Sequence, residues 1–123
     1  MKYLLDTHVL IWHFEGKLSN LVNDIFHSRD NFFHISSASL WEIAIKGSLN
    51  KLDVNFNKLL AHIQKSEFSL LQVEADYLIK LYDLPFIHRD PFDRLLIATA
   101  QSTEMTLITS DENIQKYDVV WVW

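Results

Sequence analysis

The chain has 123 residues, 49% of them hydrophobic, and this length and composition suit one compact domain spanning residues 1–123. The absence of cysteine excludes a disulfide framework, a thiolate zinc site and a cysteine nucleophile. No apolar run approaches the roughly 20 residues that a membrane helix needs, so a soluble, cytoplasmic protein is expected.

Apolar runs and amphipathic segments alternate along the chain. In chain order they predict a strand at 2–5, helices at 9–14 and 18–26, a strand at 31–35, a helix that Ser36 or Ser37 can cap and that runs to about 49, a helix at 56–64, a strand at 68–72, helices at 74–82 and 91–101, and strands at 106–109 and 119–123. Strands that alternate with helices favour an α/β fold with a central parallel sheet covered on both faces.

Four acidic residues occupy positions next to the ends of these elements. Asp6 follows the first strand and Asp111 follows the strand at 106–109, so both should emerge at the carboxyl edge of a parallel sheet. Glu42 lies about two turns into the helix after the second strand, and Asp93 lies in the first turn of the helix that Pro91 opens. These positions allow all four carboxylates to converge.

Converging carboxylates repel each other and stay ionised together only if a cation joins them. Hard oxygen ligands select Mg²⁺ or Mn²⁺, which polarise a phosphoryl oxygen and generate hydroxide from bound water. Phosphodiester hydrolysis is the chemistry that suits such a site. Each acid also has a simpler interpretation: Asp6 can be a turn former or a helix cap, and Glu42 a solvated helix residue. Asp90 before Pro91 is a typical helix cap, Asp93 complements the helix dipole, and Asp111 can cap a short helix.

The net charge of −5 is unusual for a nucleic-acid-binding protein. Without the four site acids the remainder is about −1, because −5 + 4 = −1, and bound divalent cations would offset the acids themselves. The acidity therefore argues against tight binding of duplexes through a broad basic face, but it leaves a nucleic-acid substrate open.

A few basic and aromatic side chains remain to be assigned. The basic residues nearest the acids in sequence, and thus candidates for substrate contact, are Lys46, Lys51, Arg89 and Arg94. Lys46 either faces the same cleft as Glu42 or forms an i,i+4 ion pair with it. The tryptophans are expected mainly in the core, with stacking on unpaired bases or a dimer interface as the alternatives for some of them. No histidine pair has zinc-site spacing, and no glycine-rich phosphate loop or Gly-x-Ser-x-Gly elbow is present.

Four short segments carry a resemblance to a known family. They are Leu-Leu-Asp-Thr-His at 4–8, Ser-Leu-Trp-Glu-Ile at 39–43, His-Arg-Asp-Pro-Phe-Asp-Arg-Leu-Leu-Ile-Ala at 88–98 and Ile-Thr-Ser-Asp at 108–111. Their order, and the acids within them, resemble the PIN-domain family, and most of all its branch of VapC-type toxins from bacterial toxin–antitoxin pairs. The resemblance covers almost the whole chain.

The resemblance implies a three-layer α/β/α sandwich and a Mg²⁺- or Mn²⁺-dependent endoribonuclease. Asp6, Glu42, Asp93 and Asp111 match the family's acids, and Asp90 is an extra candidate ligand. The side chains expected to orient these acids or a metal-bound water are Thr7, Thr109 and Ser110. The branch also implies a homodimer, and a cognate antitoxin that holds the toxin inactive.

Two other functions compete with this one. A haloacid-dehalogenase-type phosphatase also places an aspartate after its first strand, but its second acid is absent from Asp6-Thr7-His8. A PIN-like domain that only binds a partner is the non-enzymatic alternative. All four acids are present, which argues against a decayed catalytic site.

Overall fold

A five-stranded, all-parallel sheet forms the centre of the computed structural model, which describes all residues from 1 to 123. Its strands are β1 (Lys2–Leu5), β2 (Phe32–Ser36), β3 (Ser69–Leu71), β4 (Thr106–Ile108) and β5 (Trp121–Val122). They lie in the order β3-β2-β1-β4-β5. Leu5 on β1 pairs with Ile108 on β4, so these two neighbouring strands end at the same edge. The predicted parallel sheet is confirmed.

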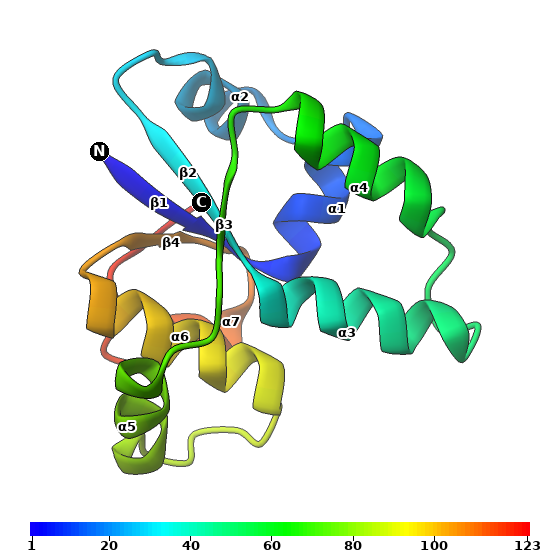
Figure 1. Cartoon of the computed structure of the whole chain (residues 1–123). Coiled ribbons are helices and arrows are strands. Elements are labelled where there is room, and N and C mark those ends of the chain that lie inside the picture. Colours follow the sequence, from blue (N-terminus) through cyan, green and yellow to red (C-terminus); the bar gives the residue numbers. More distant parts are fainter.

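Seven helices surround the sheet: α1 (Thr7–Glu15), α2 (Asn20–His27), α3 (Ser37–Ser48), α4 (Phe56–Lys65), α5 (Ala75–Asp83), α6 (Pro91–Thr103) and α7 (Glu112–Gln115). In Figure 1, α1, α2 and α4 lie on one side of the strands, and α5, α6 and α7 lie on the other. Helix α3 leaves the end of β2 and lies beside both α1 and α6. This is the predicted three-layer α/β/α sandwich.

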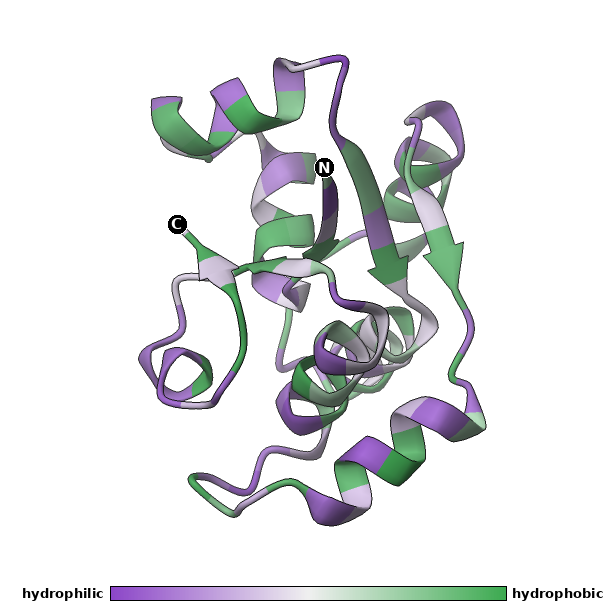
Figure 2. Cartoon of the chain, turned by 90° about the vertical axis from the view of Figure 1, so that its left-hand side faces the viewer, coloured by the Kyte–Doolittle hydropathy of each residue, from purple (hydrophilic) through white to green (hydrophobic).

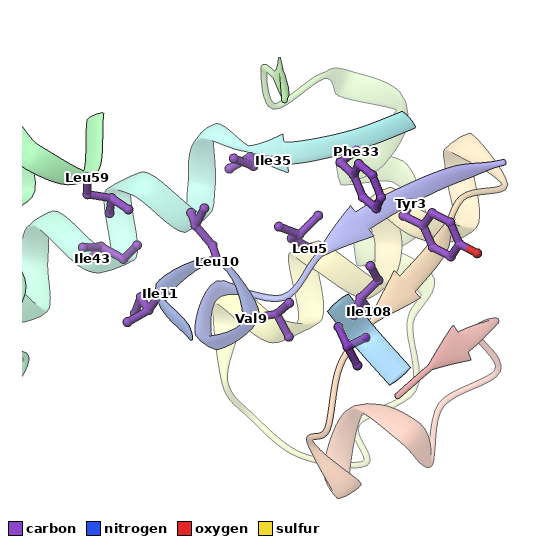
Figure 3. Packing of buried hydrophobic residues seen from close by; sticks show 11 residues of the cluster. Tyr3, Leu5, Val9, Leu10, Ile11, Phe33, Ile35, Ile43, Leu59 and Ile108 are labelled. Atoms are coloured by element: carbon purple, nitrogen blue, oxygen red, sulfur yellow. The ribbon is translucent and has the colours of Figure 1, made fainter. Parts of the chain in front are cut away.

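Alternating side chains along the strands supply two separate cores. Tyr3 and Leu5 on β1 belong to one core with residues of α1, α3 and α4, and in Figure 3 Tyr3 lies beside Phe33 of β2. Leu4 points to the opposite face, where it packs with Leu96 and Ile97 of α6. Burial on both faces is the reason that these strands are nearly continuous apolar runs.

Local capping explains where several helices begin. Ser36 ends β2, and its Oγ accepts a hydrogen bond from the backbone N of Ala38 at 3.1 Å. Asn55 accepts one from the backbone N of Lys58 and thereby opens α4. Capping by these polar side chains stabilises a helix start by about 1 kcal/mol. The helix predicted at 9–14 begins earlier, at Thr7, and the strand predicted at 119–123 contains only Trp121 and Val122.

The tryptophans lie mainly outside the core, contrary to expectation. Trp41 is 62% exposed, Trp121 and Trp123 are also exposed, and Trp12 is half-buried against the ring of Trp123. Helical and strand periodicity indicates which residues share a face, but a face becomes core only if another element covers it.

Helix α5 has an apolar face that no other part of the chain covers. Leu78, Ile79 and Tyr82 are exposed, whereas Tyr77 on the other side is buried. Figure 2 shows this helix at the bottom of the molecule, with apolar and polar segments alternating along it. None of the helices combines the length and the apolar character needed to cross a lipid bilayer.

Candidate active site

Asp6 is buried at the carboxyl edge of the sheet, between β1 and α1. Its side chain is held by Thr109, whose Oγ1 donates a hydrogen bond to Asp6 Oδ2 at 2.8 Å. The same Thr109 hydroxyl accepts a hydrogen bond from the backbone N of Asp111 at 3.0 Å. Thr109 therefore links the acid after β1 to the acid after β4. The other carboxylate oxygen of Asp6, Oδ1, is buried and has no hydrogen-bond partner.

Glu42 is the second buried acid, and only 2% of it is exposed. Lys46 Nζ donates a hydrogen bond to Glu42 Oε2 at 2.7 Å, so Lys46 forms the i,i+4 pair that the sequence left open. Glu42 Oε1 is buried without a partner, as is Asp6 Oδ1. Near the start of the same helix, Thr7 Oγ1 donates to Ser39 Oγ at 3.0 Å and ties α1 to α3.

Asp93 lies in the first turn of α6, where Asp90 caps the helix as predicted. Asp90 Oδ1 accepts hydrogen bonds from the backbone N atoms of Phe92 and Asp93 at 3.0 and 2.9 Å. Asp93 Oδ2 lies 3.3 Å from Nε2 of His88. The other ring nitrogen of His88, Nδ1, lies 2.9 Å from the hydroxyl of Tyr117. A histidine fixed by a tyrosine thus contacts Asp93.

Burial, helped by repulsion between the acids, raises the pKa values of Asp93 and Asp6. Burial raises the pKa of Asp93 to about 8, helped by repulsion from the neighbouring acids Asp90, Asp6, Asp111 and Glu42. Burial also raises the pKa of Asp6, opposed by the hydrogen bond from Thr109. A cation bound among these carboxylates would remove both penalties.

Comparison with known proteins identifies the family. The family model for the PIN domain matches residues 3–120, which is nearly the whole chain. The chain belongs to the PIN domain family. The predicted PIN resemblance is therefore confirmed. Comparison with curated protein sequences gives no significant match.

Several solved structures share the fold of this PIN domain at low sequence identity. VapBC2 from Rickettsia felis, bound to a promoter DNA fragment, has a TM-score of 0.77 at 17% identity, and the alignment covers 99% of this chain and 98% of that chain. DNA-bound VapBC from Salmonella typhimurium has a TM-score of 0.72 at 18% identity, with 100% and 97% covered. The PIN domain endonuclease Utp24 has a TM-score of 0.55 at 13% identity, with 93% and 74% covered.

The donor atoms of the site fit a hard divalent cation. Asp6 Oδ1 and Glu42 Oε1 are buried oxygen atoms without partners, and leaving such atoms unpaired is costly. Carboxylate oxygens are the ligands that Mg²⁺ and Mn²⁺ prefer. The side chains do not form a closed cage as they stand, since no three acidic or histidine residues are close enough together to hold a metal ion.

Three of the predicted orienting or contact residues are buried. Thr7 and Thr109 donate hydrogen bonds to Ser39 and Asp6, so they position other side chains. Arg94 is only 5% exposed, and its guanidinium donates to the carbonyl oxygens of Leu84 and Pro85. The expected substrate contact by Arg94 is therefore wrong, because its charged group stabilises the loop before α6.

The remaining predicted residues lie nearer the surface. Ser110 and Asp111 are half-buried, and Asp111 Oδ1 accepts hydrogen bonds from the backbone N atoms of Asn113 and Ile114, which open α7. The contact of His88 with Asp93 was not predicted. A histidine five residues before an acid, in a loop, carries no periodic signal that would reveal it.

Proposed function

We propose that this PIN domain is a VapC-type toxin, a Mg²⁺- or Mn²⁺-dependent endoribonuclease. The observation that carries the proposal is that Asp6 and Glu42 each keep a buried carboxylate oxygen without a partner, while Asp93 is repelled by Asp90, Asp6, Asp111 and Glu42. Buried carboxylates that repel each other are unfavourable unless a cation joins them. The haloacid-dehalogenase alternative has no comparable support, because the family match is to the PIN domain.

Four residues would hold the cation: Asp6, Glu42, Asp93 and Asp111, with Asp90 occupied as a helix cap through one of its oxygens. Such an ion supplies Lewis-acid stabilisation of phosphoryl charge and a more acidic bound water. The chain's own side chains prepare the site. Thr109 fixes the orientation of Asp6, and Lys46 neutralises Glu42.

His88 has a separate role in this proposal. It contacts Asp93 on one side and Tyr117 on the other, and so holds the Asp93 carboxylate in place. Lys46 and Ser110 are the half-buried polar side chains near the acids that remain candidates for contact with the substrate phosphates.

The substrate and partners are proposed from the family branch. RNA is the proposed substrate, and the cytoplasm is the proposed location. Two of the fold neighbours are VapBC complexes, and this supports a cognate antitoxin as a partner. A homodimer is proposed through the uncovered face of α5, where Ile79 is 63% exposed and Tyr82 is 90% exposed. Apolar patches of this kind typically mark a protein interface.

Cleavage of a short unstructured RNA by the purified chain tests the proposed activity. The wild type should cleave with Mg²⁺ or Mn²⁺ and should stop in EDTA. Asp6→Asn should lose about 100-fold or more, since even outer residues of metal sites cost 10- to 100-fold. Asp24→Asn, which changes an exposed acid on α2, is the matched control and should cleave normally. Equal cleavage by wild type and Asp6→Asn would contradict the proposal.

Expression in growing cells tests the toxin role. The wild type should arrest growth when no antitoxin is supplied, and Asp6→Asn should not. If the two are equally harmless although the wild type cleaves RNA in vitro, the nuclease proposal stands and the toxin proposal fails.

A further inference from the structure

Two aromatic side chains lie together at the rim of the acidic site. Trp41 projects from α3 and Phe92 from the first turn of α6, with ring centroids 5.2 Å apart and an interplanar angle of 75°. Phe92 is half-buried, but Trp41 keeps 62% of its surface exposed. Most of the indole is therefore free to contact something outside the chain.

The position of this aromatic pair relative to the acids is fixed by the backbone. Trp41 precedes Glu42, and Phe92 precedes Asp93. Successive residues on a helix point about 100° apart, so Glu42 enters the interior while Trp41 remains at the surface beside it. The backbone N of Phe92 donates a hydrogen bond to Asp90 Oδ1 at 3.0 Å, which fixes the first turn of α6 that carries Phe92.

Charge considerations indicate which kind of contact a nucleic acid would need here. The chain carries a net charge of −5, Lys46 is paired with Glu42, and the guanidinium of Arg94 is buried. This leaves the exposed Lys51 and Arg89, and the remaining N–H donors of Lys46, to bind phosphates. Stacking of a base on an aromatic ring needs no charge and accepts any base, because every base has a π-face.

We propose that Trp41, supported by Phe92, is a stacking platform for an unpaired base next to the bond that is cleaved. This inference rests on the proposed endoribonuclease function and adds a positioning residue to it. In this proposal the exposed indole of Trp41 contacts the RNA substrate. A protein partner on the same surface is the competing assignment, and the experiment below separates the two.

Single-turnover cleavage of a short unstructured RNA with Mn²⁺ tests the proposal. Trp41→Ala should raise the protein concentration needed for half-maximal rate by about ten-fold, which is the loss expected for one stacked base, while the maximal rate changes less. Trp41→Phe should recover most of the loss because it keeps an aromatic ring. Phe32→Ala is the matched control, since Phe32 is also 62% exposed but begins β2, at the opposite edge of the sheet.

A second RNA with an abasic site beside the cleaved bond identifies the stacked base. The difference between wild type and Trp41→Ala should disappear with this RNA. If Trp41→Ala matches Phe32→Ala on the intact RNA, the proposal is overturned. If Trp41→Ala instead halves the mass in solution and leaves RNA cleavage unchanged, Trp41 belongs to a protein interface, and the proposal is also overturned.

Failure of the proposed function gives a different result from failure of this inference. If the wild type cleaves no RNA, the nuclease proposal fails. The anisotropy of the same labelled RNA with Mn²⁺ then measures RNA binding and tests by itself whether Trp41 stacks on a base. Binding that is weakened by Trp41→Ala and spared by Phe32→Ala supports it. Equal binding by both variants, or no binding by the wild type, overturns it.

Discussion

The metal-free protein should become less stable as the pH rises from about 5 to about 7. The pKa of Asp93 is raised to about 8, chiefly by burial and then by the neighbouring carboxylates. In the unfolded chain this group would titrate near 3.8. Between these two values the folded state holds a proton that the unfolded state has lost, so the free energy of unfolding falls with increasing pH.

The size of the effect follows from proton linkage. One fully linked proton changes the free energy of unfolding by about 1.4 kcal/mol per pH unit, which gives at most about 3 kcal/mol between pH 5 and pH 7. The Asp93 side chain keeps 14% of its surface exposed, so we expect about 1–2 kcal/mol. His13 acts in the opposite direction. Its pKa is lowered, mainly by burial, so stability rises as the pH passes through the range just below 6.5.

Urea unfolding at pH 5, 6 and 7 in EDTA measures this dependence. Asp93→Asn cannot ionise, so the difference in slope between wild type and Asp93→Asn isolates Asp93 from the histidines. Asp24→Asn, at an exposed acid, should keep the wild-type slope. Saturating Mn²⁺ should reduce the fall of the wild-type free energy of unfolding with pH. The reason is that Mn²⁺ binds the folded state more tightly once Asp93 has lost its proton. Equal slopes for wild type and Asp93→Asn would refute the reasoning.

Three further predictions test individual contacts. Arg94→Leu should lower the free energy of unfolding by about 2–4 kcal/mol in urea, because buried carbonyl partners lose their donor; an effect no larger than that of Arg89→Leu, at an exposed position, would contradict this. Thr109→Val should weaken Mn²⁺ binding about ten-fold by calorimetry, since Asp6 loses its orienting hydroxyl, whereas unchanged affinity would remove that role. Ile79→Glu should halve the mass measured by light scattering if α5 forms the proposed homodimer interface; an unchanged dimer would place the interface elsewhere.

The parts of the structure that local patterns determine were predictable from the sequence. The run at 2–5 forms β1 with the expected bounds, and Ser36 caps α3 as its position suggested. Parallel strand pairing then placed Asp6 and Asp111 at one edge, because β1 and β4 are neighbours that end together. The cap role of Asp90 also follows from local sequence, since Asp before Pro is a typical helix start.

Contacts between distant segments were not predictable. From the sequence, Arg94 is expected to be a free cation beside Asp93. In the structure its guanidinium donates hydrogen bonds to the preceding loop and to Tyr117, which lies 23 residues later in the chain. The exposure of Trp41 depends on which neighbour covers the outer face of α3, and periodicity does not contain that information. Single-domain organisation over residues 1–123 and the roles of the acids stay predictions.

Calorimetric titration of the metal-free protein with Mn²⁺ tests the central claim most directly, because it asks whether the acids bind a divalent cation at all. The wild type should bind Mn²⁺ more tightly as the pH rises from 6 to 8, since Asp93 must release its proton. Asp6→Asn should bind it much more weakly, and Asp24→Asn should bind it as the wild type does. Equal Mn²⁺ affinity in the wild type and Asp6→Asn would contradict the account.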